Sequence, residues 1–300
     1  MAKPIRSGYV VTLEQKYKAI DLYKSGNYNY TQVAKLVQAA PRNIRNFLTR
    51  QDFTGQSNSI CHRKYEVNDN IFNIIDTEEK AYFLGLLYAD GYNDTTKRKT
   101  VKIELQEKDV LVLEKFRAFL GTTSPLKYAV RKDRPTTSPT YTLSITNQQI
   151  SKDLERWGCI KKKSLILEFP TFLEDNLVRH FIRGYFDGDG YVSKLCCGLT
   201  STKNFCEKIK FILDKELNIY CNLKLNKENN NITTDLTISG GIQIRKFLTW
   251  IYNNSTIHLD RKYTRYLKHL AYEAHLNTAM IKRKEYDEKS KQLLEEIIND

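Results

Sequence analysis

Hydrophobic positions in the first fifty residues recur with the spacing of short helices. The first helix is expected over residues 12–26, with Thr12 as its N-cap. Its apolar residues fall on one helix face: Leu13, Tyr17, Ile20 and Tyr23. A second helix is expected at 31–37, capped by Thr31, and a third begins at Pro41, whose missing N–H is not needed in a first helical turn. The last two helices supply a small predicted core: Val33, Leu36, Val37, Ile44, Phe47 and Leu48.

The longer part of the chain repeats one order of elements twice. From residue 71 the pattern predicts a helix, strand, helix, strand and closing helix, and the same order returns from residue 171. In residues 101–106, apolar and polar side chains alternate as they do in a half-buried strand. The pattern therefore predicts an α+β fold of two pseudo-symmetric repeats, 71–170 and 171–270, followed by a C-terminal helix over 271–300.

The third N-terminal helix is expected to expose a basic face. That face carries five Arg and Asn residues: Arg42, Asn43, Arg45, Asn46 and Arg50. Arg and Asn pair bidentately with guanine and adenine. Residues 1–50 resemble the helix-turn-helix at the start of many transposases, resolvases and phage proteins, which implies contact with a major groove. The alternative is a three-helix bundle whose basic face reads no bases. Residues 51–70, which are polar and without periodicity, are expected to be a linker.

Charge narrows the range of partners. The formal net charge is +13, and residues 1–64 hold eleven Lys or Arg against three Asp or Glu. Clustered basic surface is typical of proteins that bind a polyanion, most often nucleic acid. No stretch has the apolar length of a membrane span, and the N-terminus lacks the hydrophobic core of a signal peptide. We therefore expect a cytoplasmic or nucleoid-associated protein without a membrane partner.

Two apolar runs end in the same unusual way. Residues 82–91 read YFLGLLYADG, and residues 181–190 read FIRGYFDGDG. Glycine weakens a helix, so its presence inside one needs a reason. Each run places small residues four apart, on one helix face: Gly85 and Ala89, Gly184 and Gly188. Stripes of small residues let two helix backbones approach closely, so we expect these two helices to pack against each other.

Each of these helices ends in an aspartate followed by a glycine. Asp90 precedes Gly91 and Asp189 precedes Gly190, and both glycines are expected in the left-handed conformation that ends many helices. A helix C-terminus is partly negative, so two carboxylates that meet there need compensating positive charge. Divalent cations bound by carboxylate and carbonyl oxygens would supply it and would suit phosphodiester hydrolysis. The expected metal ligands are Asp90, Asp189, Ala89 and Gly188.

Both runs resemble the LAGLIDADG motif of homing endonucleases in the single-chain, two-motif form. The likeness covers roughly residues 71–270 and includes KKKSLILEFP and LDRKYTRY, which are typical of phage and intron members. It implies a monomeric enzyme that cuts both strands of a long, specific DNA site with Mg²⁺ or another divalent cation such as Mn²⁺. Asp90 and Asp189 are then the catalytic acids. The sixth motif position is Asp187 in the second copy and Tyr88 in the first, which leaves both catalytic acids in place.

The same resemblance implies further catalytic residues. The family places a polar residue on each sheet near the metals, and the matching residues are Gln106 and Thr200. It also places a basic residue after the third helix of each repeat. The candidates are Lys161, Lys162 and Lys163 in the first repeat, and Arg261 and Lys262 in the second. Lys163 and Lys262 are the assigned residues, with a simple phosphate contact as the alternative role for each.

The family fold places helices on one face of each sheet and DNA on the other. In residues 101–106, alternation turns Lys102, Glu104 and Gln106 toward DNA. The further DNA-facing candidates are Lys127, Arg131, Lys194, Lys224 and Lys227. Many of these side chains are expected to contact the DNA backbone, where contacts fix position without reading sequence.

Two other functions compete with cleavage of DNA. Some bacterial regulators resemble a degenerate LAGLIDADG fold joined to a helix-turn-helix, but they tend to lack the two acids that this chain retains. An RNA splicing maturase would bind intron RNA with the same basic surface, so the sequence does not separate it from an endonuclease. An endonuclease inside an intein is disfavoured, because the chain begins with Met and ends without the His-Asn pair of self-splicing.

Overall fold

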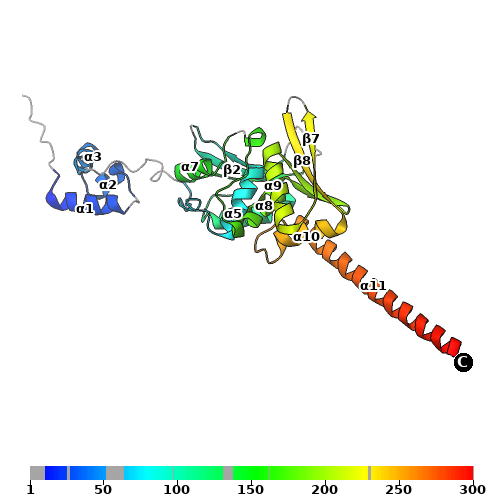
Figure 1. The fold of residues 1–300 in the computed structure, drawn as a ribbon. Coiled ribbons are helices and arrows are strands. Elements are labelled where there is room, and N and C mark those ends of the chain that lie inside the picture. Colours follow the sequence, from blue (N-terminus) through cyan, green and yellow to red (C-terminus); the bar gives the residue numbers. More distant parts are fainter. Residues whose placement is uncertain are drawn as a thin grey trace, which may run out of the picture. The chain divides into compact units, whose positions relative to one another are not determined.

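The chain forms two compact units, residues 1–66 and residues 67–300. The computed structural model (Figure 1) describes residues 11–25, 28–51, 64–96, 98–130, 138–161, 163–228 and 231–299. Within these ranges, no helix combines the length and the apolar character that crossing a bilayer requires.

The N-terminal unit holds the three expected helices: α1 (Leu13–Lys24), α2 (Tyr30–Leu36) and α3 (Pro41–Arg50). Thr12 caps α1 as predicted, and Gln15 completes a reciprocal capping box. The predicted cap of α2 was wrong. Asn29 is the N-cap, because its side chain accepts a hydrogen bond from the backbone N–H of Gln32 while the Gln32 side chain reaches back to Asn29.

The small core of this unit differs in part from the predicted one. Its buried residues include Ala19, Tyr23, Val33, Ile44 and Leu48. Three residues expected on the buried stripe are instead exposed: Leu13 by 71%, Tyr17 by 68% and Leu36 by 48%. Three short helices enclose too little volume to cover every apolar position, since small domains bury a small share of their surface.

In the second unit, the order of elements is the same in both repeats. The first repeat contains α5 (Glu78–Asp90), β1 (Gly91–Asn93), β2 (Thr100–Gln106), α6 (Val110–Phe119), β3 (Lys127–Ala129), β4 (Thr140–Thr146) and α7 (Gln148–Arg156). The second contains α8 (Asp175–Asp189), β5 (Gly190–Val192), β6 (Cys196–Ser201), α9 (Lys203–Leu217), β7 (Cys221–Glu228), β8 (Asn231–Ser239) and α10 (Gly241–Tyr252). Two 3₁₀ turns, Glu107–Asp109 and Lys163–Leu165, lie in the first half, and α11 (Asp260–Asn299) follows the second.

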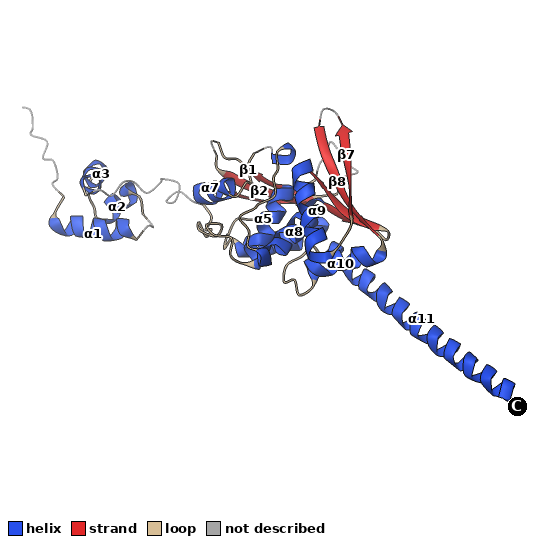
Figure 2. Ribbon diagram, viewed as in Figure 1, coloured by secondary structure: helices blue, strands red, loops and turns tan. Residues whose placement is uncertain are grey.

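Each repeat forms one antiparallel four-stranded sheet with matching topology. The strand orders are β1-β2-β4-β3 and β5-β6-β8-β7, and Figure 2 shows both sheets with α5 and α8 beside each other. The predicted α+β class is confirmed. The strands β1, β3, β5 and β7 were not predicted, because runs of three residues are too short to show alternation and β7 is polar along most of its length.

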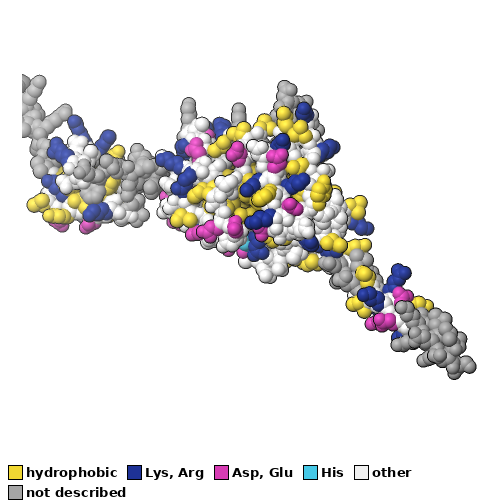
Figure 3. Space-filling view, viewed as in Figure 1, with side chains coloured by type: hydrophobic (Ala, Val, Ile, Leu, Met, Phe, Trp, Pro, Cys, Tyr) yellow, Lys and Arg dark blue, Asp and Glu magenta, His cyan; other side chains and the backbone are white. Residues whose placement is uncertain are grey.

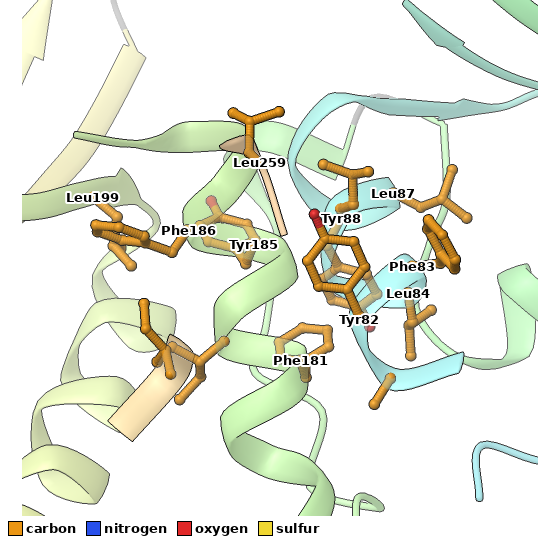
Figure 4. Packing of buried hydrophobic residues seen from close by; sticks show 14 of the residues in the cluster. Tyr82, Phe83, Leu84, Leu87, Tyr88, Phe181, Tyr185, Phe186, Leu199 and Leu259 are labelled. Atoms are coloured by element: carbon orange, nitrogen blue, oxygen red, sulfur yellow. The ribbon is translucent and has the colours of Figure 1, made fainter. Parts of the chain in front are cut away.

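One hydrophobic core runs through both repeats. In β2 the burial of successive residues alternates, with Val101, Ile103 and Leu105 inside. The buried side chains of α5 and α8 lie at the centre of this core, where Tyr82, Tyr88 and Phe181 pack together (Figure 4). Because the two repeats share this core, neither has an independent one.

The C-terminal helix begins earlier than the sequence pattern indicates. It was expected from residue 271, whereas α11 starts at Asp260. Its first turns are held by the packing of Tyr263 and Tyr266 against Tyr252 of α10, at ring-centroid distances of 5.8 Å. The apolar stripe that includes these tyrosines is no longer than two helical turns. The sequence pattern alone therefore does not predict that the helix starts here.

Candidate active site

The site is built on the contact between α5 and α8. A Cβ atom at Gly85 would lie 2.1 Å from the carbonyl oxygen of Phe181, and one at Gly184 would lie 1.9 Å from that of Tyr82. Real Cβ atoms never approach so closely, so the two helix backbones touch where any side chain would hold them apart. Glycine is therefore required at both positions despite its cost to helix stability.

The same contact continues to the ends of both helices. A Cβ atom at Gly188 would lie 2.3 Å from the Cβ of Ala89 and 3.0 Å from Oδ2 of Asp90. The Asp90 carboxylate thus lies against the last turn of the partner helix, one residue before Asp189. The small residues named from the sequence all lie at this interface, and they bring the two terminal aspartates together.

The glycines after the acids are not left-handed, contrary to expectation. Gly91 has φ −79° and Gly190 has φ −86°, and both already belong to extended strands. Their lack of a side chain serves a close approach instead. A Cβ atom at Gly91 would lie 2.5 Å from the carbonyl oxygen of Leu87, and one at Gly190 would lie 2.4 Å from the ring of Phe186. Each chain therefore passes directly from helix to strand, and Asp90 and Asp189 stand at the two transitions.

The two neighbouring carboxylates make ionisation at the site unfavourable. Both reach the surface, yet partial burial raises the pKa of Asp90 to about 6, and the nearby charge of Asp189 adds to the rise. Burial also raises the pKa of Asp189, against the lowering effects of Tyr185, Lys163 and Lys262. The residues of the chain compensate this negative charge only in part, so the pair favours a bound cation.

Two buried lysines flank the acids in matching positions. Lys163 donates a hydrogen bond from Nζ to the carbonyl oxygen of Gly91, and Lys262 donates to those of Phe186 and Asp187. Both bind carbonyls at the helix ends, which are partly negative. Burial lowers the pKa of Lys262 to about 8, opposed first by the charge of Asp187.

The competing basic residues are engaged elsewhere or lie outside the described residues. Arg261 donates from Nε to both carboxylate oxygens of Asp109, each at 3.1 Å. Lys161 lies 4.0 Å from Asp94, and Lys162 is outside the described ranges. Among the candidates that the structure describes, Lys163 and Lys262 are those that reach the helix ends.

Asp187 has an environment unlike that of Asp189. It is 1% exposed and accepts hydrogen bonds from the hydroxyls of Tyr82 and Tyr252 and from the backbone N–H of Leu259. Its counterpart Tyr88 donates to the carbonyl oxygen of Trp157. The sixth motif position therefore anchors each helix to a following loop, and Asp187 does not face the surface.

Strand register changes the assignment of the polar sheet residues. Gly91 pairs with Ile103, and Gly190 pairs with Leu199. The residue after Ile103 is Glu104, and the residue after Leu199 is Thr200. Glu104 is therefore the counterpart of Thr200, and Gln106 lies two residues further along the strand. Gln106 was expected to be the equivalent of Thr200, and that assignment is wrong by two residues along the strand.

Glu104 and Thr200 each begin a matching row across the open face of a sheet. In the first sheet, the row runs from Glu104 on β2 to Thr142 on β4 and Lys127 on β3. In the second, it runs from Thr200 on β6 to Asp235 on β8 and Lys224 on β7. Each row combines one threonine, one carboxylate and one lysine.

The threonine and the carboxylate exchange places between the two rows. The Thr200 hydroxyl donates to Asp235 at 2.6 Å, and the Thr142 hydroxyl lies 3.4 Å from Glu104. The site residues that the sequence reading missed are Thr142 and Asp235. Alternation within 231–239 was the signal that could have identified Asp235, since it falls between residues that face the core.

The remaining DNA-facing candidates are distributed as follows. Lys102 is exposed on the open face of β2, and Lys194 lies in the turn between β5 and β6. Lys227 pairs with Ile232, an odd number of positions from Lys224, so it points to the opposite sheet face and does not share the predicted one. Arg131 lies outside the described residues.

In the N-terminal unit, α3 presents the expected polar face. Arg42, Arg45, Asn46 and Arg50 are exposed, whereas Ile44 and Leu48 face the core. Asn43 is half-buried, and Arg45 lies over the ring of Tyr30 at 5.5 Å. Basic side chains are visible on this unit and on the second unit in Figure 3.

The donor set of the central site suits a hard divalent cation. The carboxylates of Asp90 and Asp189 supply oxygen donors, which Mg²⁺ and Ca²⁺ prefer, while the carbonyls of Ala89 and Gly188 remain predicted ligands. No group of three or more His, Cys, Asp or Glu side chains gathers among the described residues. Two acids leave coordination positions for water and phosphate oxygens, as in catalytic Mg²⁺ sites.

Comparison with known proteins identifies part of the chain. Residues 176–252 match the family model described as a LAGLIDADG-like domain. The match covers the second repeat. Across 186 residues, or 59% of the chain, the sequence is 27% identical to the replication factor C small subunit of Methanocaldococcus jannaschii. The chain spans about a tenth of the length of this curated relative.

The chain also has a low overall similarity to several solved structures. The chain is similar to the I-LtrWI LAGLIDADG homing endonuclease bound to target DNA, with 12% identity, a TM-score of 0.43, and coverage of 69% of this chain and 92% of that one. It is also similar to the N-terminal LAGLIDADG domain of DUF199/WhiA, with 18% identity, a TM-score of 0.38, and coverage of 61% and 89%. Likeness at this level carries no weight for activity, which depends on the geometry of the chain itself.

Proposed function

We propose that the chain is a site-specific DNA endonuclease of the LAGLIDADG type that hydrolyses phosphodiester bonds. The convergence of Asp90 and Asp189 is the observation that carries this proposal. The two acids come from separate repeats, and the glycine-mediated contact between the helices puts Asp90 beside Gly188, the residue before Asp189. Burial raises the pKa of both Asp90 and Asp189, and perturbed carboxyl groups of this kind are common at functional sites.

The residues of the chain bind the substrate and hold the catalytic charges. Asp90, Asp189 and the adjacent carbonyls of Ala89 and Gly188 would hold Mg²⁺ or Mn²⁺, which when bound polarises the scissile phosphate and activates water. Lys163 and Lys262 fix the helix ends through the carbonyls that they bind, and their charge offsets that of the acids. The open sheet faces contact the duplex on either side as a pseudo-symmetric monomer.

The N-terminal unit adds a second DNA contact in this proposal. Its α3 face offers Arg42, Arg45, Asn46 and Arg50 on one rigid helix. Such a helix fits a major groove, where Arg and Asn read guanine and adenine. A helix-turn-helix in the same chain as the nuclease repeats would lengthen the recognised sequence and raise affinity.

The deciding experiment compares wild type with Asp90→Asn and Asp189→Asn on a randomised duplex library in the presence of Mg²⁺. Asn keeps the shape of the side chain and removes its negative charge. We expect the wild type to cut a discrete site, and each variant to bind that site while its cutting rate falls by at least 100-fold. Asp214→Asn, which removes one exposed carboxylate from α9, is the matched control and should cut as the wild type does.

The competing functions give different results in this assay and in a parallel measurement of binding to a structured intron RNA. If all four proteins bind one sequence and none cuts it, the chain is a DNA-binding regulator. If duplex DNA is not bound but a structured intron RNA is, the chain acts as a maturase. Either result overturns the assignment of Asp90 and Asp189 as catalytic acids.

A further inference from the structure

A buried aspartate of the first repeat makes an ion pair that reaches into the second. Asp109 ends the 3₁₀ turn that follows β2, and its side chain is 6% exposed. Both of its carboxylate oxygens accept a hydrogen bond from Nε of Arg261, at 3.1 Å each. Arg261 belongs to the first turn of α11 and directly precedes Lys262. The pair therefore joins the first repeat to the residue beside a lysine of the candidate site.

Asp109 makes this pair in place of a role within its own repeat. It is the N-cap residue of α6, a position where an aspartate side chain commonly accepts a hydrogen bond from a backbone N–H of the first helical turn. Within the part of the chain that the structure describes, the Asp109 side chain makes no such capping bond. Its carboxylate points to Arg261 instead. The choice of partner thus serves the contact between the repeats and not the start of α6.

The first turn of α11 is held from both repeats. On the side of the second repeat, the Asp187 carboxylate accepts a 2.8 Å hydrogen bond from the backbone N–H of Leu259, and Lys262 binds carbonyls at the end of α8. On the side of the first repeat, Asp109 holds Arg261. Lys262 is only 3% exposed. A small shift of this turn would therefore move its amine away from the carbonyls that it binds.

The lysine of the first repeat is held in the same crosswise manner. Thr202, the N-cap of α9, is the counterpart of Asp109, because each residue precedes the helix that follows the second strand of its repeat. The Thr202 hydroxyl donates to the carbonyl oxygen of Leu167 at 2.5 Å and accepts from the N–H of Phe205. Leu167 lies four residues after Lys163. In both halves, a capping residue of one repeat holds the segment that carries the lysine of the other.

We propose that Asp109 is a positioning residue, which fixes the first turn of α11 through Arg261 and so places Lys262 beside the acids. This inference rests on the proposed function, because it takes Lys262 as part of a site that cuts DNA. The two strands of a duplex are related by a two-fold axis, which the pseudo-symmetric repeats can match. Lys163 and Lys262 lie at different helix ends, so each would serve one strand. Loss of the Asp109 contact should therefore slow the cutting of one strand more than that of the other.

The test compares Asp109→Asn with wild type in the full-length chain, on the duplex that the wild type selects. Each strand carries a different dye, so denaturing electrophoresis gives a cutting rate for each strand. We expect one strand to be cut more slowly by about 10-fold or more and the other by less than about 3-fold, because displacement of a positioned group is costly in rate. Binding, measured with a chelator present, should stay within about 3-fold of wild type, because phosphate contacts dominate affinity and Asp109 is buried.

The matched control is Glu114→Gln in the same repeat. It removes a carboxylate that pairs with Arg117 at 3.0 Å within α6. This variant should cut both strands as the wild type does. All rates are compared at a temperature where every variant is folded.

A second variant tests whether Asp109 acts through Arg261. The Arg261 side chain is 44% exposed, so Arg261→Gln leaves the core intact. The double variant Asp109→Asn, Arg261→Gln should slow the affected strand no more than the more damaging single variant does, because the two residues form one contact. Additive losses would show two separate roles, and weaker DNA binding by Arg261→Gln alone would identify a phosphate contact. Either result overturns the proposal.

Chemical labelling gives a readout that does not depend on cutting. Lys262 and Lys163 are 3% and 6% exposed, so both amines should be shielded from acetylation by an amine-reactive reagent. We expect Asp109→Asn to speed the acetylation of Lys262 and to leave that of Lys163 unchanged, as measured by mass spectrometry of peptides. A general loosening of the fold would expose both lysines.

The outcomes separate this inference from the proposed function. If the wild type cuts DNA and Asp109→Asn slows both strands equally or neither, the inference is overturned and the endonuclease proposal stands. If the wild type cuts no DNA, the endonuclease proposal fails, and the labelling decides the inference alone. Selective exposure of Lys262 would then support Asp109 as its positioning residue, and equal labelling of the two lysines would overturn it.

Discussion

At the scale of single residues, two aspartates in one helix turn have opposite roles. Asp187 is enclosed, and three donors satisfy its carboxylate. Asp189, two positions on, reaches the surface beside Asp90. A helix advances 100° per residue, so neighbours two apart face different surroundings. The first aspartate anchors the helix end, and the second is the proposed catalytic acid.

The pH dependence of the free energy of unfolding should reveal the raised pKa of Asp90. The pKa of this carboxyl is raised from 3.8 to about 6 in the folded chain, so the folded state binds the proton more strongly than the unfolded state does. Without metal, stability should therefore fall as pH rises from about 4 to 6. Asp90→Asn removes this loss and should be more stable than wild type at pH 7, by about 1 kcal/mol after allowance for solvent screening.

Urea denaturation of both proteins in the presence of a chelator measures that difference. At pH 4 the advantage of the variant should shrink toward zero, because the wild-type carboxyl is then largely protonated in the fold. Equal stability at pH 7 would show that Asp90 titrates with an ordinary pKa.

The sequence predicts correctly where a residue lies when a local pattern fixes its position, as at a helix end. It fails where the position depends on how two strands pair. The positions of Asp90 and Asp189 follow from the motif alone. The counterpart of Thr200 does not, because pairing between β1 and β2 depends on a turn whose length the sequence does not reveal. Gln106 was assigned from the family resemblance, and alternation puts Glu104 on the same face, so only the observed strand pairing separates the two.

At the scale of elements, the backbone contact between α5 and α8 is the feature on which the site depends. Gly184→Ala tests it directly. The added methyl group would need the space of the Tyr82 carbonyl, 1.9 Å away, which is backbone and cannot turn aside. We expect a loss of 3 kcal/mol or more in the free energy of unfolding, as for severe overpacking in a core.

A substitution elsewhere in α8 provides the comparison. Asn176→Ala lies in the exposed first turn of the same helix and should change stability by less than about 0.5 kcal/mol. Similar stability for Gly184→Ala and wild type would mean that the helices can separate without cost. Cutting is measured separately, at a temperature where Gly184→Ala remains folded. Loss of cutting there would show that the two acids must approach as closely as they do in the wild type.

Element prediction was accurate for long periodic stretches and poor for short ones. The helices and the strands β2, β4, β6 and β8 were recognised by pattern, whereas β7, although eight residues long, was not. The strands β1 and β5, three residues each, are created by the sharp passage from helix to strand at Gly91 and Gly190. The close contacts that require glycine there come from Leu87 and Phe186 in the preceding turn, and a sequence pattern contains no such information.

At the scale of the second unit, a buried arginine in α8 ties the repeats together through the first turn of α5. Arg183 of α8 is 1% exposed and donates to Glu78 of α5 at 2.7 Å. It also donates to the carbonyl oxygens of Ile251 and Ile257. Burial lowers the pKa of neighbouring His180 to about 4, so its ring is neutral at pH 7 and does not oppose the guanidinium.

Arg183→Met should therefore destabilise the whole unit. The variant leaves the carbonyls of Ile251 and Ile257 without this donor and the Glu78 carboxylate without its guanidinium partner. Breaking a buried ion pair in this way costs about 3–5 kcal/mol. Differential scanning calorimetry should show one transition at a lower temperature, because the two repeats share a core. Lys152→Met, an exposed position on α7, is the control and should leave the midpoint unchanged; two separate transitions in Arg183→Met would mean that the repeats fold independently.

The joining of both repeats in one polypeptide affects how the two halves of the molecule can change by mutation. A homodimer presents every side chain twice, so a base change in one half of its recognition sequence must be matched in the other, and its targets are palindromes. In this chain, by contrast, each repeat has its own coding sequence, so the two half-surfaces are specified separately. The Thr142–Glu104 and Thr200–Asp235 pairs already differ between the halves. Each half-surface can therefore mutate without its partner, and a DNA site read by both need not be symmetric.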